Sequence, residues 1–78
     1  MNIEKETAVL SANVKYLREH YHLTRAEMAG IMGVGLNTLS TLENGEMPKR
    51  LKSDSLILLS RHFHLPVNDL LYTELKDI

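Results

Sequence analysis

The stretch TRAEMAGIMGVGLNTLSTLENG, residues 24–45, decides how the rest of the chain folds. Thr24 followed three residues later by Glu27 is typical of a capped helix N-terminus. Gly33 can adopt the positive φ that a sharp turn between two helices commonly requires, and Gly45 is typical of a helix end. The stretch therefore predicts two short helices joined by a tight turn. These helices cover residues 25–32 and 36–44.

The apolar residues of this stretch fall at helical spacing on one face of each short helix. Two amphipathic helices of this kind bury their apolar faces in a shared core. Ala29 is small at the point where the two helix axes have to approach closely. The expected buried face consists of Met28, Ala29, Met32, Val34, Leu39 and Leu42. The outward face of the second helix carries Leu36, Asn37, Ser40 and Thr41.

Apolar periodicity predicts a long helix before this stretch. It begins between Ile3 and Thr7, with Thr7 and Ser11 as alternative caps, and it ends near His20 or Tyr21. Leucine and valine recur along it at the i, i+4, i+7 spacing of a single buried stripe. The stripe consists of Leu10, Val14 and Leu17.

Two more helices are predicted after the stretch. Residues 46–52 hold a proline and four charges without apolar periodicity, which is typical of an exposed connector. Ser53 or Asp54 can cap a fourth helix, and Pro66 suits the first turn of a fifth. The fold class is therefore all-α, with five helices and no strand. The expected apolar faces are Leu56, Ile57, Leu59 and Phe63 in the fourth helix and Val67, Leu70 and Leu71 in the fifth.

Length and composition predict one small domain covering residues 1–78. A chain of 78 residues with 44% hydrophobic content can build one modest core. Residues 1–9 are an N-terminal extension or the start of the first helix, and residues 72–78 are a C-terminal tail. No apolar run approaches the roughly 20 residues that span a bilayer, and the N-terminus lacks the pattern of a signal peptide. We therefore expect a cytoplasmic protein without membrane contact.

The charge balance gives no general signal for nucleic-acid binding. The formal net charge is −1 and the pI is about 6.4, so a basic surface would have to arise from the folded arrangement. Ordinary solvated charge is the alternative interpretation of the basic residues in the middle of the chain. These residues are Lys15, Arg18, Arg25, Lys49, Arg50 and Lys52.

The four histidines do not form a pattern typical of a metal site. His20 and His22 are two residues apart, as are His62 and His64, so neither pair shares a helix face. The chain has no cysteine, and no cluster of carboxylates completes a site. Near a helix C-terminus, a partly protonated imidazole interacts favourably with the helix dipole. Since no catalytic constellation appears either, we expect no metal, no cofactor, no small-molecule substrate and no enzymatic activity.

Four segments, in this order and at this spacing, resemble the Cro/C1-repressor type of helix-turn-helix family, also called xenobiotic-response-element-like. The segments are VKYLREHYHLT, AEMAGIMGV, TLSTLENG and LPVNDLL, between Asn13 and Leu71. In that family a small residue stands where Ala29 is, a glycine opens the turn where Gly33 is, and a glutamate like Glu43 ends the recognition helix. The resemblance implies a compact, lambda-repressor-like bundle of about five helices whose third helix enters the major groove of double-stranded DNA.

The resemblance also implies roles for particular residues. Arg25 stands where the family often has a glutamine, and it would bind phosphate or a guanine edge. Asn37 can pair with adenine, whereas Leu36 can make only apolar contact, for example with a thymine methyl group. The expected DNA-binding residues are Arg25, Gly35, Leu36, Asn37, Thr38, Ser40, Thr41, Lys49 and Arg50.

The third helix departs from the family pattern. Many members have a serine at its start and a basic residue on its exposed face, where this chain has Gly35, Leu36 and Thr41. Because phosphate neutralisation supplies most nonspecific affinity, flanking residues would have to provide it. Lys49 and Arg50 are the best candidates, and a solvated loop is the alternative interpretation of both.

The function implied is a sequence-specific transcriptional regulator of the repressor kind. The alternative is a protein-interaction module, such as an antitoxin or adaptor, that has a protein partner and binds DNA only secondarily. Ile31 and Leu58 are apolar where the family commonly carries polar residues, and they are either isolated exposed residues or part of a contact patch. The tail is more apolar than a solvated end needs. We therefore expect a homodimer that forms through the fifth helix and the tail. Its contacts would be Leu71, Tyr72, Leu75 and Ile78.

Overall fold

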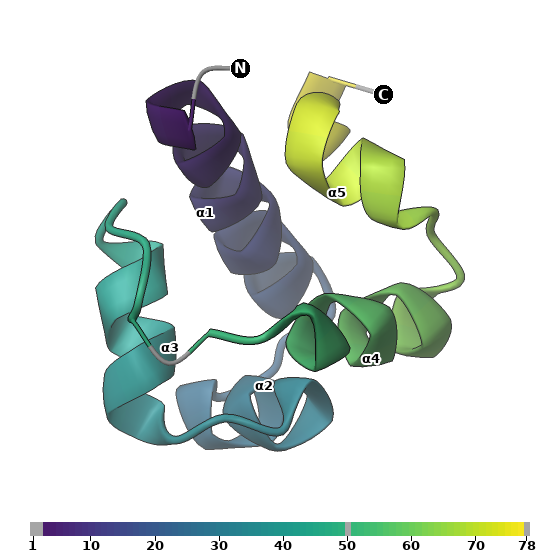
Figure 1. Cartoon of the computed structure of the whole chain (residues 1–78). Helices are drawn as coiled ribbons and strands as arrows, with labels where there is room; N and C mark the ends of the chain where they lie inside the picture. The colour runs from purple at the N-terminus through teal and green to yellow at the C-terminus, as the bar shows by residue number, and fades with distance from the viewer. Residues whose placement is uncertain (1–2, 50, 78) are drawn as a thin grey trace.

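The computed structural model describes residues 3–49 and 51–77 of the chain. Within these ranges the chain forms five α-helices and one short 3-10 helix, and it contains no strand (Figure 1). The expected all-α fold is therefore confirmed. The elements are α1 (Ile3–His20), α2 (Arg25–Met32), α3 (Leu36–Glu43), α4 (Ser53–Phe63), α5 (Val67–Tyr72) and η1 (Leu75–Asp77).

Helix α1 is the central element of the molecule. It packs against α3, α5 and η1, whereas α2 packs against α3 and α4. In Figure 1, α3 and α5 lie on opposite sides of α1, and α2 and α4 lie near its C-terminal end. The start of α1 and the end of α5 lie on the side away from α2 and α4. Helix α3 is thus held at the edge of the molecule by α1 and α2.

Most of the core consists of apolar residues that the sequence predicts to be buried; Leu75 belongs to it as well, whereas Val67 and Ile57 do not. The stripe of α1 is buried, as are the apolar residues of α2 and α3, and Val34 in the turn packs against them. Burial of these side chains is the main favourable contribution to folding. The buried cluster is Leu10, Val14, Leu17, Met28, Ala29, Met32, Leu39, Leu42, Leu59, Leu70 and Leu75.

Local interactions fix both ends of α2 as predicted. The Thr24 hydroxyl accepts a hydrogen bond from the Glu27 backbone N–H (3.1 Å), and the Thr24 N–H donates to the Glu27 carboxylate (2.9 Å). Gly33 ends the helix with φ 70°, and the Val34 N–H donates to the Ala29 carbonyl (3.0 Å). A side chain at Gly33 would be strained at this φ. The capping box and the glycine turn therefore set the angle between α2 and α3.

Two predictions for α4 are wrong. Its N-cap is Lys52, which makes no side-chain capping bond, and Ser53 and Asp54 already lie inside the helix. Ile57 is 42% exposed and does not belong to the core face. The contacts of α4 with α2 and α5 bury the face that carries Leu59, and Ile57 projects away from it.

Over residues 3–49 and 51–77, no helix has the length and apolar character that crossing a bilayer requires.

Candidate nucleic-acid interface

The structure places the predicted outward face of α3 at the surface. Leu39 and Leu42 are completely buried, which fixes the rotation of the helix about its axis. Leu36 and Asn37 in the first turn therefore project into solvent, and Leu36 is 53% exposed. Gly35 is the N-cap of the helix. The half-buried residues of this helix include Thr38, Ser40 and Thr41.

The polar side chains on this face differ in how they are bonded. The Thr41 hydroxyl donates to the Asn37 backbone carbonyl (2.9 Å), so its proton is used within the helix. Within the described residues, the Asn37 carboxamide and the Ser40 hydroxyl have no hydrogen-bond partner. Their donors and acceptors are available to a ligand. An asparagine amide can bond both N6 and N7 of adenine in the major groove.

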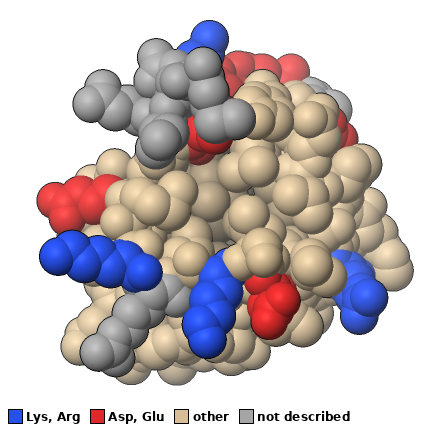
Figure 2. All heavy atoms as spheres, in the orientation of Figure 1, with Lys and Arg blue, Asp and Glu red and all other residues tan. Residues whose placement is uncertain are grey.

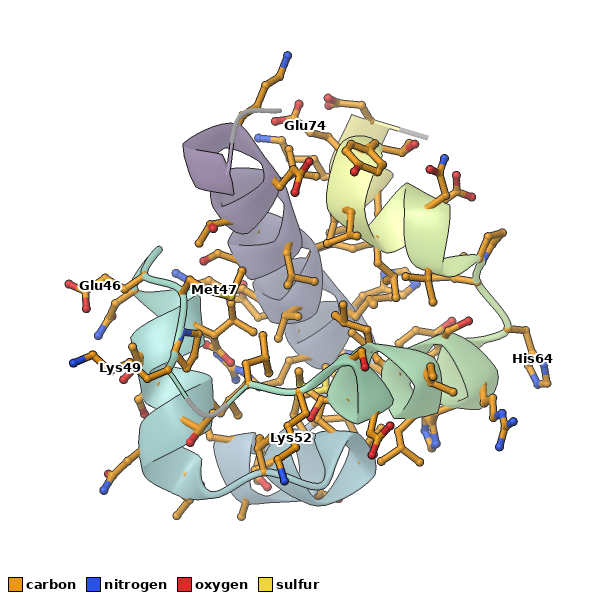
Figure 3. All side chains as sticks on the ribbon, viewed as in Figure 1. Glu46, Met47, Lys49, Lys52, His64 and Glu74 are labelled. Carbon is orange, nitrogen blue, oxygen red and sulfur yellow. The ribbon has the colours of Figure 1, made fainter. Side chains whose placement is uncertain are left out.

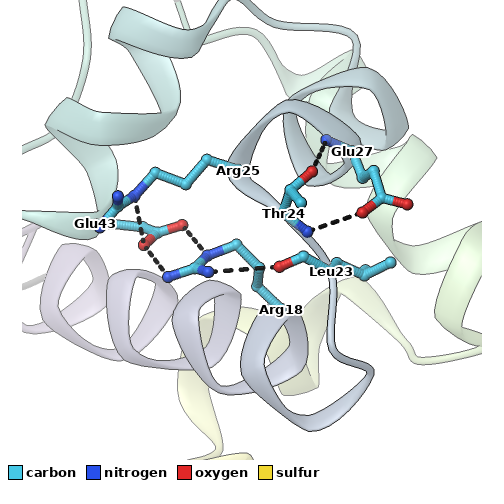
Figure 4. A network of polar contacts seen from close by, with 6 residues as sticks. All are labelled: Arg18, Leu23, Thr24, Arg25, Glu27 and Glu43. Carbon is cyan, nitrogen blue, oxygen red and sulfur yellow. Dashed lines mark hydrogen bonds and ion pairs between the residues drawn. The ribbon is translucent and has the colours of Figure 1, made fainter.

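A buried ion pair fixes the C-terminal end of α3 against α1 (Figure 4). The Arg18 guanidinium donates from Nε to Glu43 Oε2 (2.9 Å) and from Nη2 to Glu43 Oε1 (3.0 Å). The Glu43 side chain is only 4% exposed, and that of Arg18 is 14% exposed. The hydrogen bond to Glu43 raises the pKa of Arg18, so this residue remains charged. Sequence reasoning missed this pair, which joins residues 25 positions apart.

Arg25 also faces Glu43. Its Nε lies 3.8 Å from Glu43 Oε1, and its side chain is 60% exposed. Arg18 already neutralises the Glu43 carboxylate, so the three side chains together carry one net positive charge. This charge lies at the first residue of α2, where the family resemblance implies a DNA contact.

Basic side chains flank α3 rather than lie on it. Lys49 lies beside α3 and Lys52 at the start of α4, as the labels of Figure 3 show. Most of the face seen in Figure 2 is neither basic nor acidic. Lys52 also lines a groove whose other wall includes Leu36 and Asn37. Arg50, predicted as a backbone contact, lies outside the described residues.

Asn13 of α1 forms a second buried polar attachment, which sequence reasoning also missed. Its Nδ2 donates to the carbonyls of Leu70 (2.8 Å), Thr73 (2.7 Å) and Asp69 (3.4 Å). Its Oδ1 accepts from the Leu75 N–H (2.9 Å). Asn13 is 1% exposed. Its hydrogen bonds to Leu70 and Thr73 satisfy backbone carbonyls at the end of α5 that have no partner within the helix. An asparagine inside the predicted apolar face of α1 was the available signal.

The predicted dimer contacts fall into different environments. Leu75 is buried in the core at 6% exposure, so its assignment to an exposed dimer contact is wrong. It is buried because η1 folds back onto α1, where Asn13 binds its N–H. Leu71 is half-buried, and Tyr72 is 54% exposed. Ile78 lies outside the described residues.

Two of the four histidines, His20 and His62, belong to an aromatic cluster between the ends of α1 and α4. His20 stacks on Tyr16 with ring centroids 5.4 Å apart, and Tyr21 contacts Phe63 at 5.1 Å. His62 packs edge-on against Phe63. In the part of the chain that the structure describes, no group of three or more histidine or acidic side chains is arranged to hold a metal ion.

The comparisons with known proteins agree with this geometry. A helix-turn-helix family model matches residues 14–70. No curated protein and no solved structure matches the chain. The match covers more than half of the chain and includes α2, the Gly33 turn and α3. The chain belongs to the Cro/C1-type helix-turn-helix family of DNA-binding transcriptional regulators.

Proposed function

We propose that this protein is a sequence-specific repressor of transcription that binds DNA as a homodimer, with α3 in the major groove. One observation supports this function most strongly. Helix α3 buries Leu39 and Leu42 completely and leaves the exposed Asn37 amide with no hydrogen-bond partner in residues 3–49 and 51–77. An exposed amide of this kind can read a base edge.

Residues around α3 would supply the phosphate contacts. Arg25, Lys49 and Lys52 come from α2, from the connector and from the start of α4, and all three are exposed. Arg50 is proposed as a further contact from its place in the same connector. Because phosphate contacts position the protein without reading sequence, these residues and α3 would have separate tasks. Repression would follow from occupation of the operator by the bound protein.

The dimer surface that we propose is centred on Tyr72 and the exposed part of Leu71. The Tyr72 hydroxyl donates to Glu6 (3.0 Å), which raises the pKa of Tyr72 and joins the end of α5 to α1. Ile78 is retained as a proposed contact, and Leu75 is not. A two-fold arrangement would place two α3 helices on half-sites about one helical turn apart.

The test is selection of binding sites from random duplexes at low and moderate salt, followed by sequencing. We expect enrichment of a palindrome, together with a steep loss of affinity as salt rises. Absence of any enriched sequence at both salt concentrations would overturn the proposed function. Sedimentation tests the dimer separately, because a monomer at high micromolar concentration would contradict it.

Two variants separate base contacts from phosphate contacts. Asn37→Ala should relax the preference at one base pair by roughly 1 to 3 kcal/mol. Lys49→Ala should weaken binding evenly across sequences and reduce the salt dependence. Arg61→Ala is the matched control, because Arg61 is an exposed cation in the last turn of α4. An unchanged site preference for Asn37→Ala would remove that residue from the interface.

A protein-interaction module remains the second candidate. Ile57 and Leu58 are adjacent on α4, and each is 42% exposed. Neighbouring exposed apolar residues are a feature of protein contact surfaces. If the selection experiment enriches no DNA, loss of a bound protein partner in Ile57→Ser and Leu58→Ser variants would favour this function.

A further inference from the structure

We propose that the first turn of α3 reads A·T base pairs, and that Leu36 contacts the methyl group of a thymine in one of them. This inference rests on the proposed function and adds the class of DNA sequence that the same surface binds. It follows from three properties of the groove-facing side chains: their charge, their internal hydrogen bonds and their apolar exposure.

The first property is the absence of a cation on α3. The helix has the sequence LNTLSTLE, without arginine or lysine. The commonest specific contact to guanine is a bidentate one from arginine or lysine to O6 and N7. Arg25 is directed towards Glu43 at the opposite end of α3, 3.8 Å away, rather than towards the first turn. Helix α3 therefore lacks the side chain that usually selects G·C pairs.

The second property is the state of the Thr41 hydroxyl and of the Asn37 amide. Because the Thr41 hydroxyl donates to the Asn37 carbonyl, it cannot also donate to guanine N7 or O6. It can only accept a hydrogen bond, while its methyl group remains apolar. The Asn37 amide keeps both a donor and an acceptor free within the described residues, which matches the N7 and N6 groups of adenine.

The third property is the exposed apolar surface at the start of α3. Leu36 is the first residue of the helix and is 53% exposed. Gly35 beside it has no side chain, and apart from its two chain neighbours nothing lies within 4 Å of the position that a Cβ would occupy there. No neighbouring atom at Gly35 therefore keeps a base edge away from Leu36. The apolar group that the major groove presents is the thymine methyl group.

The experiment removes single methyl groups from the DNA. Each thymine of the selected operator is replaced in turn by deoxyuridine, which keeps the base pair and lacks only the methyl group. We expect the dissociation constant of the wild-type protein to rise about fourfold at one position in each half-site, the change for one buried methyl group. At that position, 5-methylcytosine should bind better than cytosine.

The matching protein variant assigns the contact to Leu36. For Leu36→Ala, removal of the same DNA methyl group should change the dissociation constant by less than about twofold, because the two changes remove the same contact. Ile57→Ala is the control, since Ile57 is an apolar residue of similar exposure on α4. This variant should keep the full fourfold sensitivity.

Two results would overturn this inference while leaving the proposed function intact. In the first, a palindrome is enriched but Leu36→Ala and wild type respond equally to every methyl removal. In the second, Leu36→Ala and Asn37→Ala lose the wild-type preference at positions of the operator that are G·C pairs. Absence of an enriched sequence would instead overturn the proposed function itself.

Discussion

Two buried polar anchors, both within the described residues, attach α1 to other helices, and they differ in the groups that they bond. The charged anchor joins the Arg18 side chain to the Glu43 side chain and thereby holds α3. The neutral anchor joins the Asn13 side chain to backbone groups of α5 and η1. The charged anchor fixes α3, the helix that we propose to enter the DNA. The neutral anchor fixes α5 and η1 near the proposed dimer surface.

This difference decides what each anchor contributes to stability. Removal of one partner of the charged anchor leaves a charge that is largely buried, which is costly, but both partners can be replaced together by apolar side chains. The backbone groups bonded by Asn13 cannot be replaced in this way. Removing one partner of the charged anchor should therefore cost more stability than removing the Asn13 side chain. The neutral anchor, in contrast, cannot be replaced by apolar side chains.

The largest expected effect is that of Glu43→Ala. Because Arg18 would lose both of its hydrogen bonds to Glu43 while its side chain is only 14% exposed, we expect the free energy of unfolding to fall by about 4 kcal/mol. Urea denaturation followed by circular dichroism measures this change. Glu46→Ala, at an exposed glutamate of the connector, should change the stability by less than about 0.5 kcal/mol. Equal losses in the two variants would show that the charged anchor is not stabilising.

Asn13→Ala should have the next largest effect. It leaves the Leu75 N–H and the Leu70 carbonyl without their buried partner, and we expect a loss of about 2 kcal/mol. The matched control is Asn68→Ala, at an exposed asparagine of α5. Amide hydrogen exchange should accelerate at Leu75 before it does in α3. Uniform acceleration throughout the chain would contradict a local role for this anchor.

The double variant Arg18→Met with Glu43→Leu should differ from wild type by about 1 kcal/mol or less. Apolar side chains of similar volume can replace a buried ion pair without loss of stability. The free energy of unfolding, measured beside that of Glu43→Ala, gives the comparison. If the double variant is as unstable as Glu43→Ala, then the core at this junction requires the charges themselves.

The smallest effect concerns the local capping box of α2. Hydrogen bonds from the backbone and side chain of Thr24 lower the pKa of Glu27, which is fully exposed. A lowered folded-state pKa means that the stabilisation is present above the unfolded pKa of about 4.3 and is lost as the pH falls through the lower folded value. Wild type should therefore be slightly more stable than Glu27→Gln at neutral pH, and this difference should vanish in acid.

The free energy of unfolding of wild type and of Glu27→Gln, measured from neutral pH into acid, tests the expected direction of this pH dependence. Glu46→Gln serves as the control, because Glu46 is an exposed glutamate outside the capping box. A stability difference between wild type and Glu27→Gln that grows as the pH falls would contradict the expected direction.

Sequence reasoning succeeded where the physical cause is local. Thr24 and Glu27 are three residues apart, and Gly33 supplies its own backbone freedom, so the boundaries of α2 follow from adjacent residues. The buried face of α3 follows from the helical period. Leu36 and Asn37 do not belong to that buried face, so their outward positions could be predicted together with it.

Sequence reasoning failed where the partners are distant along the chain. Arg18 and Glu43 are 25 residues apart, and Asn13 bonds groups 56 to 62 residues away. No periodicity links such pairs. Leu75 was assigned to the surface for the same reason, since its burial depends on η1 folding back onto α1.

The sequence by itself determined the helices, their apolar faces and the turn between α2 and α3, because capping, glycine conformation and helical period act over a few residues. Only the tertiary structure decided which polar side chains are buried as anchors and which remain free at the surface. That outcome depends on how α1, α3 and α5 pack, since packing removes water from Asn13, Arg18 and Glu43 and leaves Leu36 and Asn37 exposed.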